Sequence, residues 1–304
     1  LTLESTPGLG SAFHLTLPLP KARPGRQAPA DEAPGMSFPG VRVLVAEDNP
    51  VNQKLVGYML ENLGVEVLMA EDGKVAYETL KREQDATRPV DLVLMDLQMP
   101  EWDGLTATRA IRAREHDRGL PRLPVLALTA NAMAGFERTC LEAGMDGVLI
   151  KPLKEEELTA ALDQWLPGRA QASQAAPAAA EEPTSGPGPR LFKADKIRKL
   201  CHDDPARIEE MLSLFITSTE PLLETLSQAI LTGDAVQAAR LAHQIKGAAA
   251  YLGAEEMTRH AASTEQRAKA GDCSGCTDAM EELEAAFIAL RLEIEDEIQR
   301  ARGG

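Results

Sequence analysis

Polar side chains follow four apolar segments in the first half of the chain, and their types suit phosphoryl chemistry. Glu47 and Asp48 follow the first segment, Asp96 the third, Thr129 the fourth and Lys151 the fifth. If these segments are parallel strands of one sheet, their carboxyl ends meet at one edge and share one crevice. The spacing therefore predicts an acidic cluster that includes one lysine.

Three carboxylates in one crevice repel one another and require a cation. Hard oxygen ligands with room for water favour Mg²⁺, with Glu47, Asp48 and Asp96 as the candidate ligands. An ionised Asp96 can attack phosphorus and form an acyl phosphate. Phosphoryl transfer depends mainly on positioning and charge neutralisation, which the Lys151 ammonium and the Thr129 hydroxyl can supply.

A second constellation surrounds His243 in a helical stretch nearer the C-terminus. At helical spacing its neighbours are Arg240, Lys246, Gly247 and Ala250. Glycine inside a helix costs about 1 kcal/mol relative to alanine, and here it clears space beside the imidazole. The two cations suit a phosphoryl group, whereas no acidic cluster is expected around the histidine. The pattern predicts an exposed nucleophilic nitrogen on a flat helical face where another domain can dock.

The same helix has an apolar side that is expected to face a core. The predicted buried stripe consists of Val236, Ala239, Ala242, Ala249 and Leu252, with Ile245 at its margin. His243 lies off this stripe, which is why we expect it at the surface.

Residues 41–166 alternate between two kinds of pattern. The strand-like runs are Val41–Ala46, Val65–Met69, Val90–Met95, Pro124–Leu128 and Gly147–Ile150. The amphipathic stretches are Val51–Leu63, Gly73–Arg82, Gly104–Arg114, Gly135–Ala143 and Glu155–Trp165. Asn49 and Pro50 suit the start of the first helix, and Gly64 suits its end. Five β/α repeats predict an α/β domain with a doubly wound, five-stranded parallel sheet.

Residues 191–301 contain helical patterns and predict an all-α helical bundle. The expected helices are Lys193–Cys201, Pro205–Ser218, Pro221–Leu231, Ala235–Leu252, Ala254–Ala270 and Asp278–Arg300. Asp204, Glu220 and Asp234 stand where N-caps or first-turn acids belong. The glutamates of the last stretch, Glu297 among them, are expected on its solvated side.

Two stretches rich in Pro, Ala and Gly, residues 21–40 and 167–190, are predicted linkers because they cannot bury a core. The second, about 24 residues long, has an r.m.s. span of roughly 25–30 Å and gives an effective concentration near millimolar between the domains it joins. Residues 1–20 alternate around a Pro/Gly turn and predict a β-hairpin that is too small to fold alone.

Charge and cysteine content exclude several functional classes. The 32 Lys and Arg residues oppose 47 Asp and Glu residues, giving a formal net charge of −15. Binding to nucleic acid or contact with an anionic membrane surface is therefore not expected. Cys273 and Cys276 form a single pair without zinc-site spacing and suit a helix or loop start. With no disulfide framework, a reducing cytoplasmic location fits best.

Residues 41–166 resemble a response regulator receiver domain in the segments VLVAEDNPVN, LMDLQMPEWDG, ALTANA and LIKPL. The resemblance implies that Asp96 is the phosphoacceptor and that the backbone carbonyl of Gln98 joins the three carboxylates around Mg²⁺. It also implies a cis bond between Lys151 and Pro152. Val148 departs from the family, which often has an aromatic switch residue there. Either the signal is transmitted differently, or this domain is a way-station for phosphate.

Residues 191–300 resemble a histidine-containing phosphotransfer domain in the segment HQIKG, which Gly253 follows. Residues 1–20 are similar to the last hairpin of a histidine kinase ATP-binding domain, so the order matches tripartite hybrid sensor kinases of bacterial type. This implies a relay from the histidine of an upstream kinase core to Asp96, to His243, and on to a separate response regulator. Arg240, Lys246 and Gly247 would support the transfer. The kinase catalytic site is not expected in this chain.

Two other functions remain open at this stage. The domains could form an interaction scaffold that transfers no phosphate, although the acidic, Thr and Lys positions argue against it. A haloacid-dehalogenase-like phosphatase also uses an aspartate nucleophile on an α/β sheet. That family places Asp-x-Asp after its first strand, where this chain has Glu47, Asp48, Asn49 and Pro50.

Overall fold

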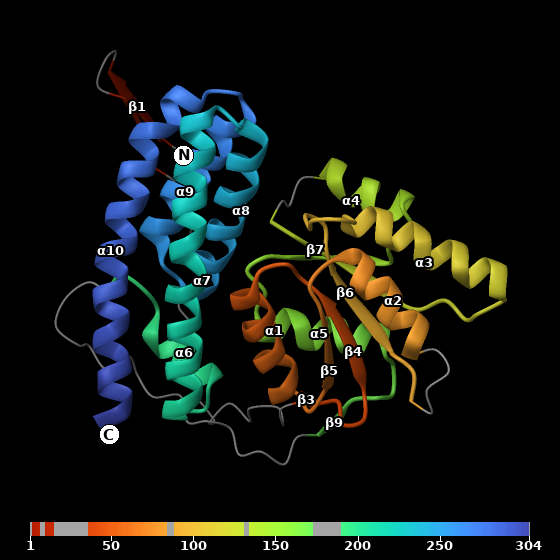
Figure 1. Cartoon of the computed structure of the whole chain (residues 1–304). Coiled ribbons are helices and arrows are strands. Elements are labelled where there is room, and N and C mark those ends of the chain that lie inside the picture. The colour runs from red at the N-terminus through yellow and green to blue at the C-terminus, as the bar shows by residue number, and fades with distance from the viewer. Residues whose placement is uncertain are drawn as a thin grey trace.

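The computed structural model contains an α/β domain and a helical domain that lie side by side (Figure 1). The residues that it describes are 2–6, 10–14, 36–83, 88–130, 134–172 and 190–303. Strands β1 (Thr2–Thr6) and β2 (Gly10–His14) pair antiparallel, which confirms the predicted hairpin pairing, while its turn lies outside the described residues.

The α/β domain is built on a five-stranded parallel sheet in the order β5-β4-β6-β7-β8. Its strands are β4 (Arg42–Ala46), β5 (Glu66–Ala70), β6 (Leu92–Asp96), β7 (Val125–Thr129) and β8 (Gly147–Ile150). Strands β4, β6 and β7 are buried along their whole length, because helices cover both faces of the sheet. The predicted fold class is confirmed.

Five helices cover the sheet. They are α1 (Pro50–Asn62), α2 (Gly73–Glu83), α3 (Gly104–Arg118), α4 (Ala134–Glu142) and α5 (Glu155–Trp165). Helices α1 and α5 share one apolar cluster with the sheet, whereas α2, α3 and α4 share the other. The side chain of Asn49 caps α1, Pro50 occupies its first position, and Gly64 follows its end with a φ of 75°. These three local predictions are confirmed.

Residues on both sides of the α/β domain add a small ribbon to it. Strands β3 (Met36–Ser37) and β9 (Gln171–Ala172) pair antiparallel, and Phe38 is fully buried. Both strands come from stretches that the sequence assigns to linkers, and they pair because the first and last segments of the domain meet beneath the sheet.

The helical domain is a closed bundle. Its helices are α6 (Ala194–Leu200), α7 (Pro205–Thr232), α8 (Ala235–Leu252), α9 (Glu255–Lys269) and α10 (Cys273–Gly303). Helix α7 packs on α8, α8 on α9 and α9 on α10, and α10 also packs on α7. Asp204 and Asp234 cap α7 and α8 as predicted. Within the described ranges, none of the helices combines the length and the apolar character that a membrane span requires.

The structure corrects four sequence expectations in this domain. Helix α7 continues through Pro221, because the buried stripe from Phe215 to Leu226 keeps its register across the proline, and Glu220 therefore caps nothing and pairs with Arg291. Helix α10 begins at Cys273 rather than at Asp278. Val236 is exposed, because the buried face of α8 turns through Ala238, Leu241 and Tyr251 instead. Glu297 is buried and pairs with Arg198 at 2.5 Å.

The two domains share one apolar cluster. Leu55 and Leu158 of the α/β domain belong to the same cluster as Phe192, Ile197 and Leu200 of the helical domain. Helix α1 contacts α6, α7 and α8. Burial of apolar surface between the domains therefore holds the edge of the sheet against α8.

Gly104 places α3 tightly against the end of β6. A Cβ atom at this position would overlap the carbonyl oxygen of Asp96 and approach Cγ of Met95 to 3.0 Å. We expect Gly104→Ala to lower the free energy of unfolding by about 2 kcal/mol, because the core there is already close-packed. Urea denaturation followed by circular dichroism checks this. The control is Gly57→Ala, where the new atom meets only the terminal methyl of Met69; equal losses would contradict the prediction.

Candidate active site at the domain boundary

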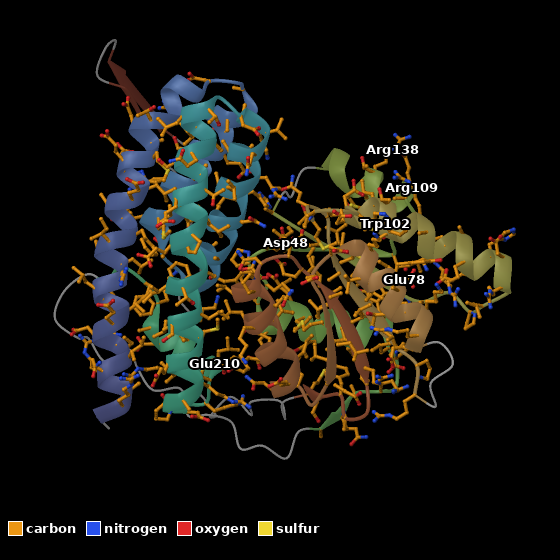
Figure 2. The ribbon with its side chains drawn as sticks, viewed as in Figure 1. Asp48, Glu78, Trp102, Arg109, Arg138 and Glu210 are labelled. Atoms are coloured by element: carbon orange, nitrogen blue, oxygen red, sulfur yellow. The ribbon has the colours of Figure 1, made fainter. Side chains whose placement is uncertain are left out.

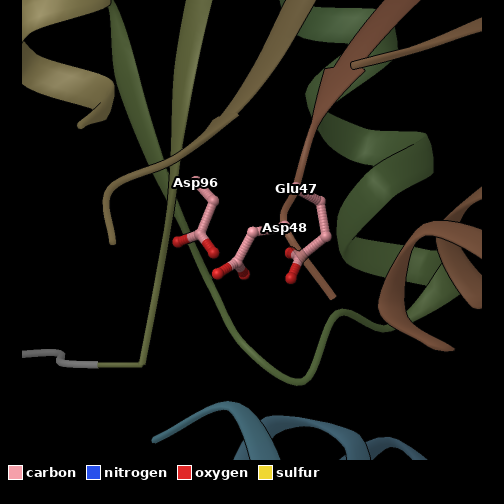
Figure 3. A group of neighbouring side chains, drawn as sticks. All are labelled: Glu47, Asp48 and Asp96. Carbon is pink, nitrogen blue, oxygen red and sulfur yellow. The ribbon is translucent and has the colours of Figure 1, made fainter. Parts of the chain in front are cut away.

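Three carboxylates converge at the carboxyl edge of the sheet. Glu47 and Asp48 follow β4, and Asp96 ends β6. One oxygen from each lies within 4.8 Å of the others, and Figure 3 shows the three side chains pointing toward one another. Glu47 and Asp96 are buried, whereas Asp48 is half-buried. Burial, followed by repulsion from Asp96, raises the pKa of Asp48.

Lys151 enters this cluster from the end of β8. Its Nζ lies 2.5 Å from Oε2 of Glu47 and 2.7 Å from Oδ2 of Asp96. Burial alone would lower the pKa of Lys151, but the two carboxylates outweigh it and raise that pKa. Burial raises the pKa of Glu47 to about 7, against the opposing attraction of Lys151. The cluster is thus an acidic site with one internal cation.

The neighbouring loops complete the edge of the sheet. The backbone N–H of Gln98 donates to Oδ1 of Asp96 at 3.3 Å. Thr129 ends β7 and is buried, and its carbonyl oxygen accepts from the backbone N–H of Lys151 at 2.7 Å. The Lys151–Pro152 bond is cis, as expected.

His243 of α8 faces this cluster from the other domain. Its side chain is 18% exposed. Nδ1 lies 2.9 Å from Oε1 of Glu265 on α9. Burial alone would raise the pKa of Glu265, but hydrogen bonds from His243, Lys246 and Lys269 outweigh it and hold that pKa well below its usual range. An ionised carboxylate can only accept, so Nδ1 is the nitrogen that donates to Glu265, and in the neutral ring the lone pair then belongs to Nε2.

A cavity of about 240 Å³ joins the two constellations. The α/β domain lines it with Glu47, Asp48, Asp96 and Lys151, among others, and the helical domain with His243, Gln244, Lys246 and Gly247. In Figure 3 a ribbon of the helical domain passes below the three carboxylates. Asp96 and the imidazole of His243 therefore line one shared space.

Polar contacts fix the position of α8 relative to the α/β domain at the cavity. The side-chain amide of Gln244 donates to Oδ2 of Asp48, and the side chain of Asn49 donates to the carbonyl oxygen of Gln244 at 3.2 Å. Asn52 lies against Gly247, where an added Cβ would come within 3.2 Å of its Nδ2. Gly247 therefore gives room to the facing domain.

Family comparisons agree with this architecture. Residues 43–163 match the model of the response regulator receiver domain, and residues 210–303 match that of the Hpt domain. The chain contains a receiver domain followed by an Hpt domain.

Similar proteins include sensor histidine kinases. The chain is 31% identical to the sensor histidine kinase GacS of Pseudomonas protegens over 92% of its own length and 32% of that protein. It is 30% identical to the signal transduction histidine-protein kinase BarA of Escherichia coli K12, over 75% of its length and 24% of that protein. The chain thus spans about a quarter to a third of these relatives.

A solved structure is also similar. It is the receiver domain of the sensor histidine kinase PA1611 from Pseudomonas aeruginosa, with magnesium ion coordinated in its active site cleft. The identity is 43%, the match covers 42% of this chain and 98% of that one, and the TM-score is 0.37.

The predicted residues of the Hpt domain do not all lie at the cavity. Lys246 and Gly247 line it, whereas Arg240 is exposed beside it, in a shallow depression shared with Gln98 and His243. Lys246 is held by Glu265 at 2.5 Å. His243 is less exposed than expected, because the receiver covers its face.

Two residues of the site escaped the sequence analysis. Glu265 places a single carboxylate against His243, where the sequence analysis expects no acidic cluster, and Gln244 reaches the receiver. Glu265 stands on the buried face of α9 with Ala261 and Ala268. A charge on an apolar stripe is the signal that could have revealed it.

Val148, at the position of the expected aromatic switch, packs half-buried against the cluster that α2, α3 and α4 share with the sheet. Its side chain cannot swing as a large ring would.

We expect Glu265→Gln to destabilise the chain by about 2 kcal/mol at pH 7, because Lys246 and Lys269 lose their counter-charge. The depressed pKa of Glu265 means that its contribution is present above about pH 4.5, the range for an unfolded glutamate, and is lost as the pH falls toward the folded value. The difference between variant and wild type therefore shrinks in acid.

Urea denaturation at several pH values measures this difference. The control is Glu295→Gln, which removes an exposed pair with Arg291. A Glu265→Gln defect that stays constant from pH 7 to acid would argue against the ionised network.

Proposed function

We propose that this chain is a phosphorelay unit of a hybrid sensor kinase. Asp96 would accept a phosphoryl group from the histidine of an upstream kinase core, in the same polypeptide or its dimer mate. His243 would take the group from Asp96 and pass it to the receiver of a separate response regulator. The observation that carries the proposal is the shared cavity, lined by Asp96 and Lys151 of the α/β domain and by His243 of the helical domain.

The central step moves one phosphoryl group between two side chains. Nε2 of His243 attacks phosphorus, a P–N bond forms, and the P–O bond to Asp96 breaks. The electron pair of that bond returns to Asp96 as a carboxylate. Because Nδ1 keeps its proton, the phosphorylated imidazole ring is cationic. The Glu265 carboxylate, 2.9 Å from Nδ1, stabilises this charge and holds the ring orientation.

Charge neutralisation falls to the receiver. Lys151 lies 2.7 Å from Asp96, so its ammonium group can follow the charge from the phosphoryl oxygens to the released carboxylate. We assign the Thr129 hydroxyl to a phosphoryl oxygen and Arg240 and Lys246 to general positive charge beside the group. These assignments rest on three positions: Thr129 ends β7 next to Ala130 of the cavity, Lys246 lines the cavity, and Arg240 lines the neighbouring depression.

The acidic cluster fits Mg²⁺. Three carboxylate oxygens within 4.8 Å of one another form a hard donor set, and Lys151 alone cannot balance them. Glu47, Asp48 and Asp96 would hold the ion with the backbone carbonyl of Gln98. When bound, it would supply neutralisation of the phosphoryl oxygens.

We expect phosphotransfer from a radiolabelled cognate kinase core to separate the two acceptors. Asp96→Asn should lose all label, whereas His243→Gln should retain label only as an acyl phosphate, which base hydrolyses. Wild type should acquire acid-labile, base-stable label on His243. If His243→Gln still phosphorylated a downstream receiver, His243 would not be the second acceptor. Label confined to Asp96 in wild type would favour a scaffold role for the Hpt domain.

Mg²⁺ should also stabilise the chain without any phosphate. An ion at 100 times its dissociation constant contributes about 2.7 kcal/mol to the free energy of unfolding. We expect this gain in wild type and its loss in Asp48→Asn, measured by thermal unfolding with and without MgCl₂. The control is Asp91→Asn, a carboxylate at the opposite end of the sheet that pairs with Arg169. A similar gain in wild type and Asp48→Asn would place the ion elsewhere.

A further inference from the structure

Helix α1 of the receiver is fastened to α7 of the Hpt domain away from the cavity. The hydroxyl of Tyr58 donates to Oε2 of Glu210 at 2.8 Å, and Nζ of Lys54 lies 2.7 Å from Oε1 of the same carboxylate. Lys54 and Arg207 both lie about 5 Å from the centre of the Tyr58 ring. In Figure 2, Glu210 stands on α7 where this helix faces α1. We call Lys54, Tyr58, Arg207 and Glu210 the clasp.

A second set of contacts lies at the far end of α1. The side chain of Asn62 donates to the carbonyl oxygen of Leu200 at 3.1 Å, and its oxygen lies 2.7 Å from Nε2 of His202. A helix of 13 residues is about 20 Å long, so these contacts are remote from Asn49 and the cavity. Phosphoryl transfer itself needs neither set, which points to a role in holding the receiver in place.

The clasp keeps the reactive face of the Hpt domain covered. His243 is 18% exposed and faces the acidic cluster, Gln244 is bonded to Asp48, and Gly247 lies against Asn52. Any other receiver keeps its acceptor aspartate at the carboxyl edge of its own sheet. To reach His243, it must present that edge to the same face of α7 and α8. Two receivers cannot occupy this face at once.

We propose that the receiver of this chain is a removable cover on the Hpt domain, and that the receiver of a second protein docks on the same face only after α1 leaves it. This inference rests on the proposed function and adds the order in which the two receivers occupy the Hpt domain. Transfer from Asp96 to His243 occurs in the covered state, and transfer outward occurs in the uncovered state. The clasp sets the balance between the two.

The linker between the two domains favours the receiver of the same chain over a separate receiver in the competition for this face. A receiver in the same chain has an effective concentration near millimolar, whereas a separate receiver competes at its own lower concentration. If only a fraction of the molecules is uncovered, the apparent affinity for the separate receiver falls by that fraction. Opening the clasp should therefore speed outward transfer without altering His243.

Two forms of the full chain can test the cover directly. The donor carries His243→Gln, so that a radiolabelled acyl phosphate of low molecular weight labels only Asp96. The acceptor carries Asp96→Asn, so that label reaches only His243, and only from the other molecule. In each chain the unused domain then receives a clasp substitution: Glu210→Lys in the donor and Lys54→Glu in the acceptor. Each substitution places like charges together at the clasp and so separates the two domains of that chain. The domain that takes part in transfer, the receiver of the donor or the Hpt domain of the acceptor, keeps its native surface.

We expect label to pass between the opened chains about tenfold faster than between the chains without clasp substitutions. The matched control pairs the same opened donor with an acceptor that carries Glu210→Lys. This acceptor is also uncovered, but its docking face now repels Lys54 of the donor, so transfer should stay slow. Circular dichroism and urea denaturation check that each form is folded. An acceptor with Tyr58→Phe, a milder change than Lys54→Glu, gives a second test of the same effect.

Equal rates with and without clasp substitutions would overturn the cover. Equal rates with the two opened acceptors would overturn the shared face. Neither result touches the proposed function, because that is measured separately as transfer from Asp96 to His243 within one wild-type chain. Absence of label on His243 in that chain would instead remove the proposed function itself.

Discussion

The structure depends on the crowding of three carboxylates at one edge of a parallel sheet. Glu47, Asp48 and Asp96 repel one another in a partly buried site, and Lys151 supplies only one opposing charge. The local excess of negative charge favours a divalent cation and a lysine that can follow charge onto a phosphoryl group. It also dictates what can face the site, because a further carboxylate would be repelled whereas an imidazole and amide groups are accepted.

The Hpt domain meets this requirement with one helical face. His243, Gln244 and Gly247 present an imidazole, an amide and free space to the acidic edge, while Glu265 lies behind the imidazole and fixes its protonated nitrogen. Apolar packing of α1 against α6, α7 and α8 holds the two walls together. In our proposal, this packing brings Asp96 and His243 together for transfer within the chain and also covers the face that a second receiver needs.

Much of this architecture could be predicted because it is encoded locally. Strand and helix patterns placed every element of the sheet to within a few residues, and the order of polar residues at strand ends placed Asp96 beside Lys151. Errors arose where a local rule competed with packing. Pro221 normally ends a helix, yet a buried stripe continues across it in α7, and Val236 lies on the predicted apolar face of α8 but is 84% exposed.

The sequence by itself determined the two fold classes, the acidic cluster and the histidine, because each depends on residue types at short, regular spacing. Only the tertiary structure decided how they meet. Glu265 lies 22 residues from His243 in the chain, and Gln244 and Asp48 are separated by 196 residues. Contacts over such separations leave no periodic signal, because they are set by how whole helices and domains pack. The cavity, the buried network behind His243 and the contacts between α1 and α7 all belong to that level.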